Sequence, residues 1–66
     1  MMEIWTMIIA LSIRAITMDL HSQEACRAAA LRMSESLQSK VICVNAHNGD
    51  VIEYENGVMV YEDIAE

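Results

Sequence analysis

The chain has no proline, no phenylalanine and only two glycines among its 66 residues. Disordered chains combine low hydrophobicity with abundant proline and glycine, whereas 55% of these residues are hydrophobic, so the sequence predicts a folded protein. A chain of this length buries only about 60% of the surface that its unfolded form exposes. We therefore expect a single domain over residues 1–66, with no room for the internal cleft of a typical enzyme.

Basic residues are also scarce. Four Lys and Arg stand against ten Asp and Glu, which gives a formal net charge of −6. Residues 1–40 hold all four bases and four of the acids, whereas residues 41–66 hold six acids and no base. Nucleic-acid binding depends on Lys and Arg that neutralise phosphates, so the sequence predicts no direct contact with DNA or RNA.

The sequence lacks an apolar run long enough to cross a membrane. The run over residues 4–13 contains Thr6 and Ser12 and ends at Arg14, far short of the ~20 residues that a spanning helix needs. The only charge before it is Glu3, whereas a secretory signal begins with basic residues. We expect a cytoplasmic protein with no membrane contact, whose two cysteines stay reduced.

The first quarter of the chain alternates in polarity. Over residues 4–16 the polar residues Thr6, Ser12 and Arg14 all occupy even positions, and every odd position is apolar. A period of two is typical of a strand. The pattern predicts one strand of about 12 residues, longer than the usual 5–6.

A helix is predicted over residues 23–38. Ser22 is a good N-cap, and Glu24 places a negative charge in the first turn, where the helix dipole favours it. The expected apolar stripe comprises Cys26, Ala29 or Ala30, Met33 and Leu37. The residues expected to face water are Arg27, Arg32, Ser34, Glu35 and Gln38.

Three short strands are predicted after Lys40, over residues 41–46, 50–55 and 58–61. Asn-Gly pairs separate them, as is typical of hairpins. The register of the second hairpin is open, because either Met59 and Tyr61 or Val58 and Val60 can face inward.

The register of the first hairpin follows from its two faces. A three-residue loop over residues 47–49 would pair Val44 with Ile52 and Ile42 with Tyr54, which keeps one face apolar. It would also place Gly49 in the left-handed conformation that such loops require.

These elements predict an α+β domain with the order β-α-β-β-β. The first strand and the strand after the helix would run parallel through a right-handed crossover. The result is a four-stranded mixed sheet with one helix packed on one face. Residues 62–66 would form an acidic, frayed tail.

Two histidines and two cysteines match the ligand count of a structural zinc site. The residues are His21, Cys26, Cys43 and His47, and their spacings lack the short Cys-x2-Cys motif. We place Cys26 under the helix and Cys43 on the opposite face of the sheet, and therefore expect buried thiols, with no metal and no cofactor. The pair Cys43 and His47 lacks a third orienting group and an oxyanion donor, so no catalytic residue is predicted.

Two surfaces remain as candidates for recognition. The sheet face away from the helix is expected to pack against a second copy of the chain, because several aliphatic side chains would otherwise stay in water. Its expected residues are Ile4, Thr6, Ile8, Ala10, Ser12, Val41, Cys43 and Val51. An acidic patch is expected to bind a protein partner with a basic surface. Its expected residues are Asp50, Glu53, Glu55, Glu62 and Asp63.

In size, charge and architecture the chain resembles the small accessory proteins of bacteriophages, including those that block host restriction or CRISPR machinery. This resemblance covers the whole chain and includes no residue motif. It implies a viral inhibitor that acts in the host cytoplasm. We thus expect a non-enzymatic acidic protein-binding module, homodimeric, that modulates or inhibits a larger protein, one that itself binds nucleic acid. The alternatives are a Cys/His metal-binding or thiol-dependent protein and a structural subunit of a larger assembly.

Overall fold

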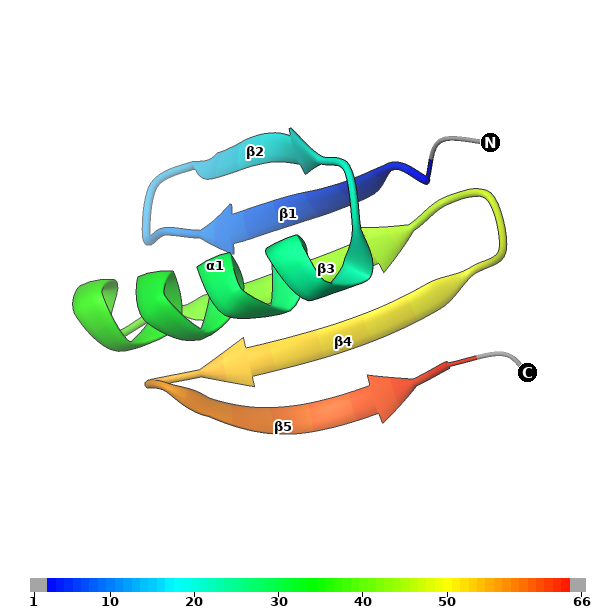
Figure 1. Cartoon of the computed structure of the whole chain (residues 1–66). Helices are drawn as coiled ribbons and strands as arrows, with labels where there is room; N and C mark the ends of the chain where they lie inside the picture. The colour runs from blue at the N-terminus through cyan, green and yellow to red at the C-terminus, as the bar shows by residue number, and fades with distance from the viewer. Residues whose placement is uncertain (1–2, 65–66) are drawn as a thin grey trace.

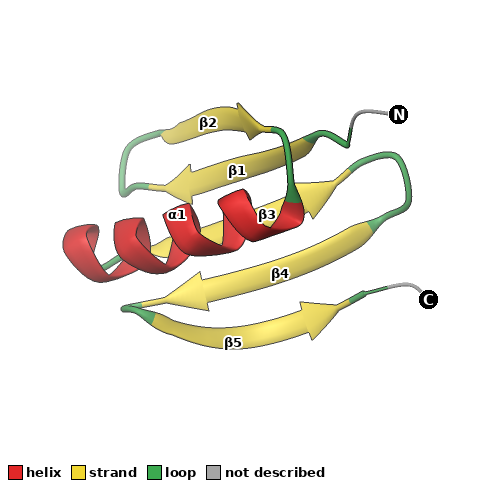
Figure 2. Ribbon diagram, viewed as in Figure 1, coloured by secondary structure: helices red, strands yellow, loops and turns green. Residues whose placement is uncertain are grey.

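The computed structural model describes residues 3–64, which form one antiparallel sheet of five strands crossed on one face by a single helix (Figures 1 and 2). In chain order the elements are β1 (Trp5–Ala10), β2 (Ala15–Leu20), α1 (Gln23–Leu37), β3 (Lys40–Asn45), β4 (Asp50–Glu55) and β5 (Val58–Asp63). The small α+β domain agrees with the sequence, but the predicted four-stranded mixed sheet is wrong.

The additional strand comes from the long alternating segment, which is a hairpin and not one strand. Ala10 pairs with Ala15, and the N–H of Leu11 donates to the carbonyl of Arg14 at 2.9 Å to close the turn. Because the hairpin reverses the chain before the helix, β3 returns antiparallel to β1, and the predicted parallel crossover does not occur. The strand order is β2-β1-β3-β4-β5, with every neighbouring pair antiparallel.

The core lies between α1 and the three central strands. Helix α1 crosses the sheet over β1, β3 and β4 (Figure 1), whereas the edge strands β2 and β5 are mostly exposed. The alternation of polarity along β1 buries one face of that strand, as expected. The buried hydrophobic residues are Trp5, Met7, Ile9, Cys26, Ala30, Val41, Cys43, Ile52 and Tyr54.

Helix α1 begins and ends close to the predicted positions. The hydroxyl of Ser22 accepts a hydrogen bond from the N–H of Ala25 at 3.0 Å, which confirms the N-cap. Gln38 ends the helix in a left-handed conformation with φ of 52°. Two face assignments are wrong: Ser34 is fully buried, and Leu37 is 43% exposed.

The turn between β3 and β4 has four residues, so the predicted three-residue loop is wrong. Asn45 pairs with Asp50, and Cys43 pairs with Ile52. Gly49 does adopt the predicted left-handed conformation, with φ of 81°, and its N–H donates to the carbonyl of Asn45 at 2.7 Å. This register turns Cys43 toward the helix and leaves Ile42 on the other face.

The turn between β4 and β5 has two residues. Asn56 and Gly57 both have positive φ, 53° and 83°, as a type I′ hairpin requires, and Glu55 pairs with Val58. A bulge at Val60 then shifts the register. Strand β5 continues through residues 62 and 63, which the sequence placed in a frayed tail; residues 65–66 of that tail lie outside the described residues.

Candidate protein-binding surface on the open face of the sheet

In the described part of the chain, no helix covers the second face of the sheet, which we call the open face. Its centre holds four aliphatic side chains, Ile8, Ile42, Val44 and Val51, which lie side by side on the three middle strands and are half-buried. The strand registers place around them Thr6, Ala10, Ala15, Thr17, Asp19, Lys40, Glu53, Glu55, Val58, Tyr61 and Asp63.

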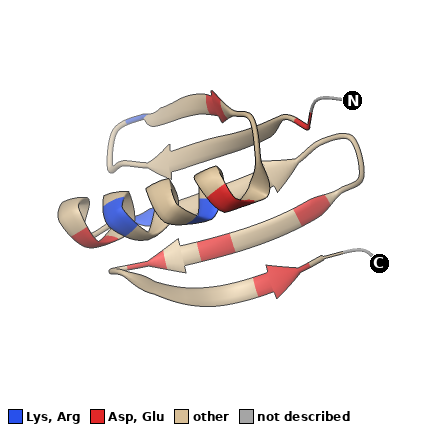
Figure 3. Cartoon of the chain, viewed as in Figure 1, with Lys and Arg blue, Asp and Glu red and all other residues tan. Residues whose placement is uncertain are grey.

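The border of the open face is acidic. Among residues 3–64 it carries Asp19, Glu53, Glu55 and Asp63 against one base, Lys40, a formal balance of four negative charges and one positive. Lys40 Nζ lies 3.7 Å from an Oε of Glu53, and the hydroxyl of Thr6 donates to Asp19 at 3.0 Å. Figure 3 shows acidic segments along β4 and at the end of β5. Lys40 therefore compensates only part of the negative charge on this face.

The expected self-association face is only partly on this surface. Of its eight residues, Thr6, Ile8, Ala10 and Val51 lie on the open face. Two others lie at its ends: Ile4 is 43% exposed just before β1, and Ser12 is exposed in the turn after it.

Val41 and Cys43 were assigned to the wrong face. Both are fully buried under α1, because the four-residue turn shifts the register of β3 by one residue. A one-residue shift moves every side chain of a strand to the other face. Ile42 and Val44 take their places on the open face.

The expected acidic patch is divided between the two faces. Glu53, Glu55 and Asp63 lie on the open face, whereas Glu62 faces the helix and Asp50 is only 4% exposed. Of the expected patch, Glu53, Glu55 and Asp63 are therefore the residues that the open face offers to a partner.

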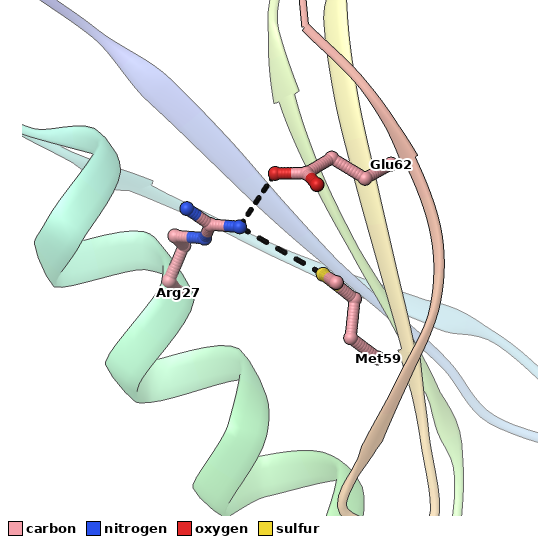
Figure 4. A network of polar contacts seen from close by, with 3 residues as sticks. All are labelled: Arg27, Met59 and Glu62. Atoms are coloured by element: carbon pink, nitrogen blue, oxygen red, sulfur yellow. Dashed lines mark hydrogen bonds and ion pairs between the residues drawn. The ribbon is translucent and has the colours of Figure 1, made fainter.

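Glu62 forms an ion pair with the helix. An Nη atom of Arg27 lies 2.6 Å from an Oε of Glu62 and 3.7 Å from the sulfur of Met59 (Figure 4). A hydrogen bond with the side chain of Tyr54, together with the charge of Glu62, raises the pKa of Arg27 above its ordinary value. Arg27 thus stays charged at every pH at which the protein would be studied, and it neutralises Glu62.

The two cysteines form a disulfide. Cys26 of α1 and Cys43 of β3 are joined with a Cα–Cα distance of 6.2 Å, and both are fully buried. The prediction of reduced thiols on opposite sides of the sheet is therefore wrong, because the register of β3 puts Cys43 directly under the helix. The sequence analysis missed this disulfide because the polarity pattern alone favoured a three-residue turn, which places the two cysteines on different faces of the sheet.

The candidate metal ligands are not brought together. His21 follows β2 and His47 lies in the β3–β4 turn, both exposed, while the cysteines are bonded to each other. Within residues 3–64, no three His, Cys, Asp or Glu side chains are arranged to hold a metal ion. In this disulfide-bonded state neither sulfur is available as a nucleophile.

A hollow of about 420 Å³ lies at one end of the sheet. It is lined by Glu3, Ile4 and Thr6 and by residues 45–48 of the β3–β4 turn. Because Ile4 and Thr6 border both surfaces, the hollow extends the open face toward this turn. The helix in the described part of the chain is too short and too polar to cross a membrane.

Comparison of the chain with models of protein families, with curated proteins and with solved structures found no match. The open face, with its apolar centre and acidic border, is therefore the feature from which we infer a function.

Proposed function

We propose that the chain is a non-enzymatic protein-binding module that uses its open face to bind a partner with a basic surface. The observation that supports this is the arrangement of that face: aliphatic side chains at the centre and uncompensated carboxylates at the border. Interfaces typically have an apolar core and a polar rim, and complementary charge across them increases the rate of association.

The size of the face sets the expected affinity. Five strands about 4.8 Å apart and six residues long at about 3.4 Å each give an area on the order of 500 Å². Stable interfaces bury about 800 Å² per partner, so this face suits a transient complex in which electrostatic attraction contributes much of the association rate.

The proposed partner is a larger protein whose basic surface normally holds nucleic acid. Carboxylates arranged on a flat sheet present negative charge to the Lys and Arg side chains that would otherwise contact phosphates. Occupying such a surface would inhibit the partner. This mode of action also follows from the resemblance to the accessory proteins of bacteriophages.

The disulfide bears on where the protein acts. We expected the cytoplasm, where glutathione and thioredoxin keep thiols reduced, but the Cys26–Cys43 disulfide favours an oxidising compartment. Rapid acid quenching of cells, alkylation of free thiols in the denatured protein and mass spectrometry distinguish the two locations. Two alkylated cysteines indicate a reducing compartment, and none indicates an oxidising one.

The proposal is tested with a short oligolysine peptide as a probe of basic character. In a nuclear magnetic resonance titration, the amides of β3 and β4 should shift more than those of α1, and binding should weaken as salt rises past about 0.15 M. The Glu55→Lys variant should weaken binding at least fivefold. Glu24→Lys makes the same change of charge on the helix and is the matched control.

Two results would contradict the proposal. Equal weakening by Glu55→Lys and Glu24→Lys would show that only the total charge matters. Shifts confined to α1 would place recognition on the helix.

A further inference from the structure

The two edges of the sheet differ in how they are protected against pairing with another strand. Strand β5 has a bulge at Val60 and ends in Glu62 and Asp63, two devices that discourage edge pairing. Strand β2 has no bulge, and Asp19 is its only charged residue. The unprotected edge is therefore β2.

The backbone of β2 offers free hydrogen-bonding groups at alternate residues. Leu11 and Arg14 form a hydrogen-bonded pair at the turn, and in an antiparallel ladder such pairs alternate with non-hydrogen-bonded ones. Because the pairs alternate from Leu11–Arg14 onward, Ile16 and Met18 direct their backbone N–H and C=O groups toward β1. The residues that direct N–H and C=O groups away from the sheet are Ala15, Thr17 and Asp19.

We propose that β2 pairs antiparallel with β2 of a second copy of this chain, with Thr17 opposite Thr17 of the second copy. Each strand would supply the N–H and C=O groups of its three outward residues to the other. The two sheets would join into one of ten strands, related by a two-fold axis that passes between the Thr17 residues.

Charge and backbone hydrogen bonding favour the register at Thr17. Pairing at Thr17 places Asp19 opposite Ala15, so the two Asp19 carboxylates lie about 14 Å apart along the strands. A shift by two residues, which places Met18 opposite Met18, would bring them to about 7 Å. The register at Thr17 also uses all three outward residues of each strand.

The side chains on the helix side of β2 support the same arrangement. Met18 is 50% exposed and Ile16 is 37% exposed, because α1 crosses the central strands and leaves this edge uncovered. In the pairing at Thr17, Ile16 lies opposite Met18 of the second copy, so each covers apolar surface of the other. The open face stays uncovered, and the inference is thus independent of the proposed function.

The first test is the mass in solution by light scattering. The wild-type chain of 7.4 kDa should have a mass of about 15 kDa at roughly 100 μM, a concentration that detects even weak dimers. Thr17→Pro removes an outward N–H that no neighbour among residues 3–64 uses, and it should weaken the dimer at least tenfold. Thr17→Ala keeps the N–H and should leave the dimer intact, as should Val58→Lys on the other edge. Emission of the buried Trp5 checks that each variant is folded.

The second test reads the register directly. Thr17→Cys should form an intermolecular disulfide under mild oxidation, because residues paired across such a ladder have Cα atoms about 5.5 Å apart. Asp19→Cys, whose sulfur would lie far from its copy, is the matched control and should stay uncrosslinked. Peptide mapping verifies that Cys26 and Cys43 remain bonded to each other. A monomeric wild-type chain, a dimer that Val58→Lys disrupts but Thr17→Pro does not, or crosslinking through Asp19→Cys would overturn the inference.

Discussion

Ser34 of α1 is hydrogen-bonded to Gly57, 23 residues away in the turn between β4 and β5. The fully buried hydroxyl accepts a hydrogen bond from the N–H of Gly57 at 3.0 Å and donates one to the carbonyl of Leu31 at 3.1 Å. The two-residue turn at Asn56 and Gly57 places this N–H against the helix. One hydroxyl therefore connects the helix to the far hairpin.

Ser34→Ala should lower the free energy of unfolding by about 1–2 kcal/mol, because the N–H of Gly57 loses its partner. Urea unfolding followed by Trp5 fluorescence measures this. Ser36→Ala is the control, since Ser36 is exposed on the same helix and its loss should change stability by less than about 0.5 kcal/mol. Equal midpoints for the two variants would show that the bond to Gly57 does not contribute to stability.

The two glycines should differ in their tolerance of alanine. Both have positive φ, which costs a side chain about 1–2 kcal/mol. At Gly49 an added Cβ meets open space, whereas at Gly57 it would lie 3.0 Å from the Cβ of Glu35. Gly57→Ala should therefore destabilise the protein more than Gly49→Ala. Thermal unfolding of the two variants measures the difference, and the reverse order would contradict the close approach of this turn to the helix.

The Cys26–Cys43 disulfide should contribute about 3 kcal/mol of stability, the value expected when a crosslink closes a loop of about 17 residues. The clearest comparison uses one sequence: the wild-type chain unfolded in urea with and without a reductant. Because both sulfurs are fully buried, reduction should proceed only as the chain unfolds. Coincident unfolding curves for the two redox states would contradict a stabilising role for the crosslink.

The alternation over residues 4–16 was correctly assigned to strand structure, but its interruption was missed. The turn at residues 11–14 contains neither glycine nor proline, so it carries no ordinary turn signal. The sign of a chain reversal lies just after residue 16. The polar residues of β2, Thr17 and Asp19, occupy odd positions, whereas Thr6 of β1 occupies an even one. A hairpin in which Ala10 pairs with Ala15 requires this change of parity, because paired residues share a face.

The error in the β3–β4 register has a different cause. The prediction maximised the apolar content of one face, whereas the protein buries Asn45 and Asp50 on the helix side at the end of the sheet. The side chain of Asn45 accepts a hydrogen bond from the N–H of His47 at 3.0 Å, which reduces the cost of burying it. The polarity of the residues alone could not reveal that a hydrogen bond offsets the burial of Asn45. The register that buries Asn45 also decides whether Cys43 can bond to Cys26 and which residues of β3 lie on the open face.

Ile8 and Ile9 are adjacent in β1 but lie on opposite faces of the sheet. Ile9 is 2% exposed beneath the helix, and Ile8 is half-buried at the centre of the open face. Ile9→Ala should lower the free energy of unfolding by about 2–5 kcal/mol, since it leaves a cavity in the core. Ile8→Ala should cost at most about 1 kcal/mol, because only part of its side chain is removed from water.

The variants Ile8→Ala and Ile9→Ala should also differ in partner binding, in the opposite order to their effects on stability. Affinity for the oligolysine probe and for any basic partner should fall in Ile8→Ala, which removes apolar surface at the centre of the open face. Ile9→Ala, measured below its unfolding temperature, should bind like the wild type because its side chain does not reach that surface. If Ile8→Ala were as destabilising as Ile9→Ala, the open face would have to be covered in the isolated chain, and it could not be the surface that meets the partner.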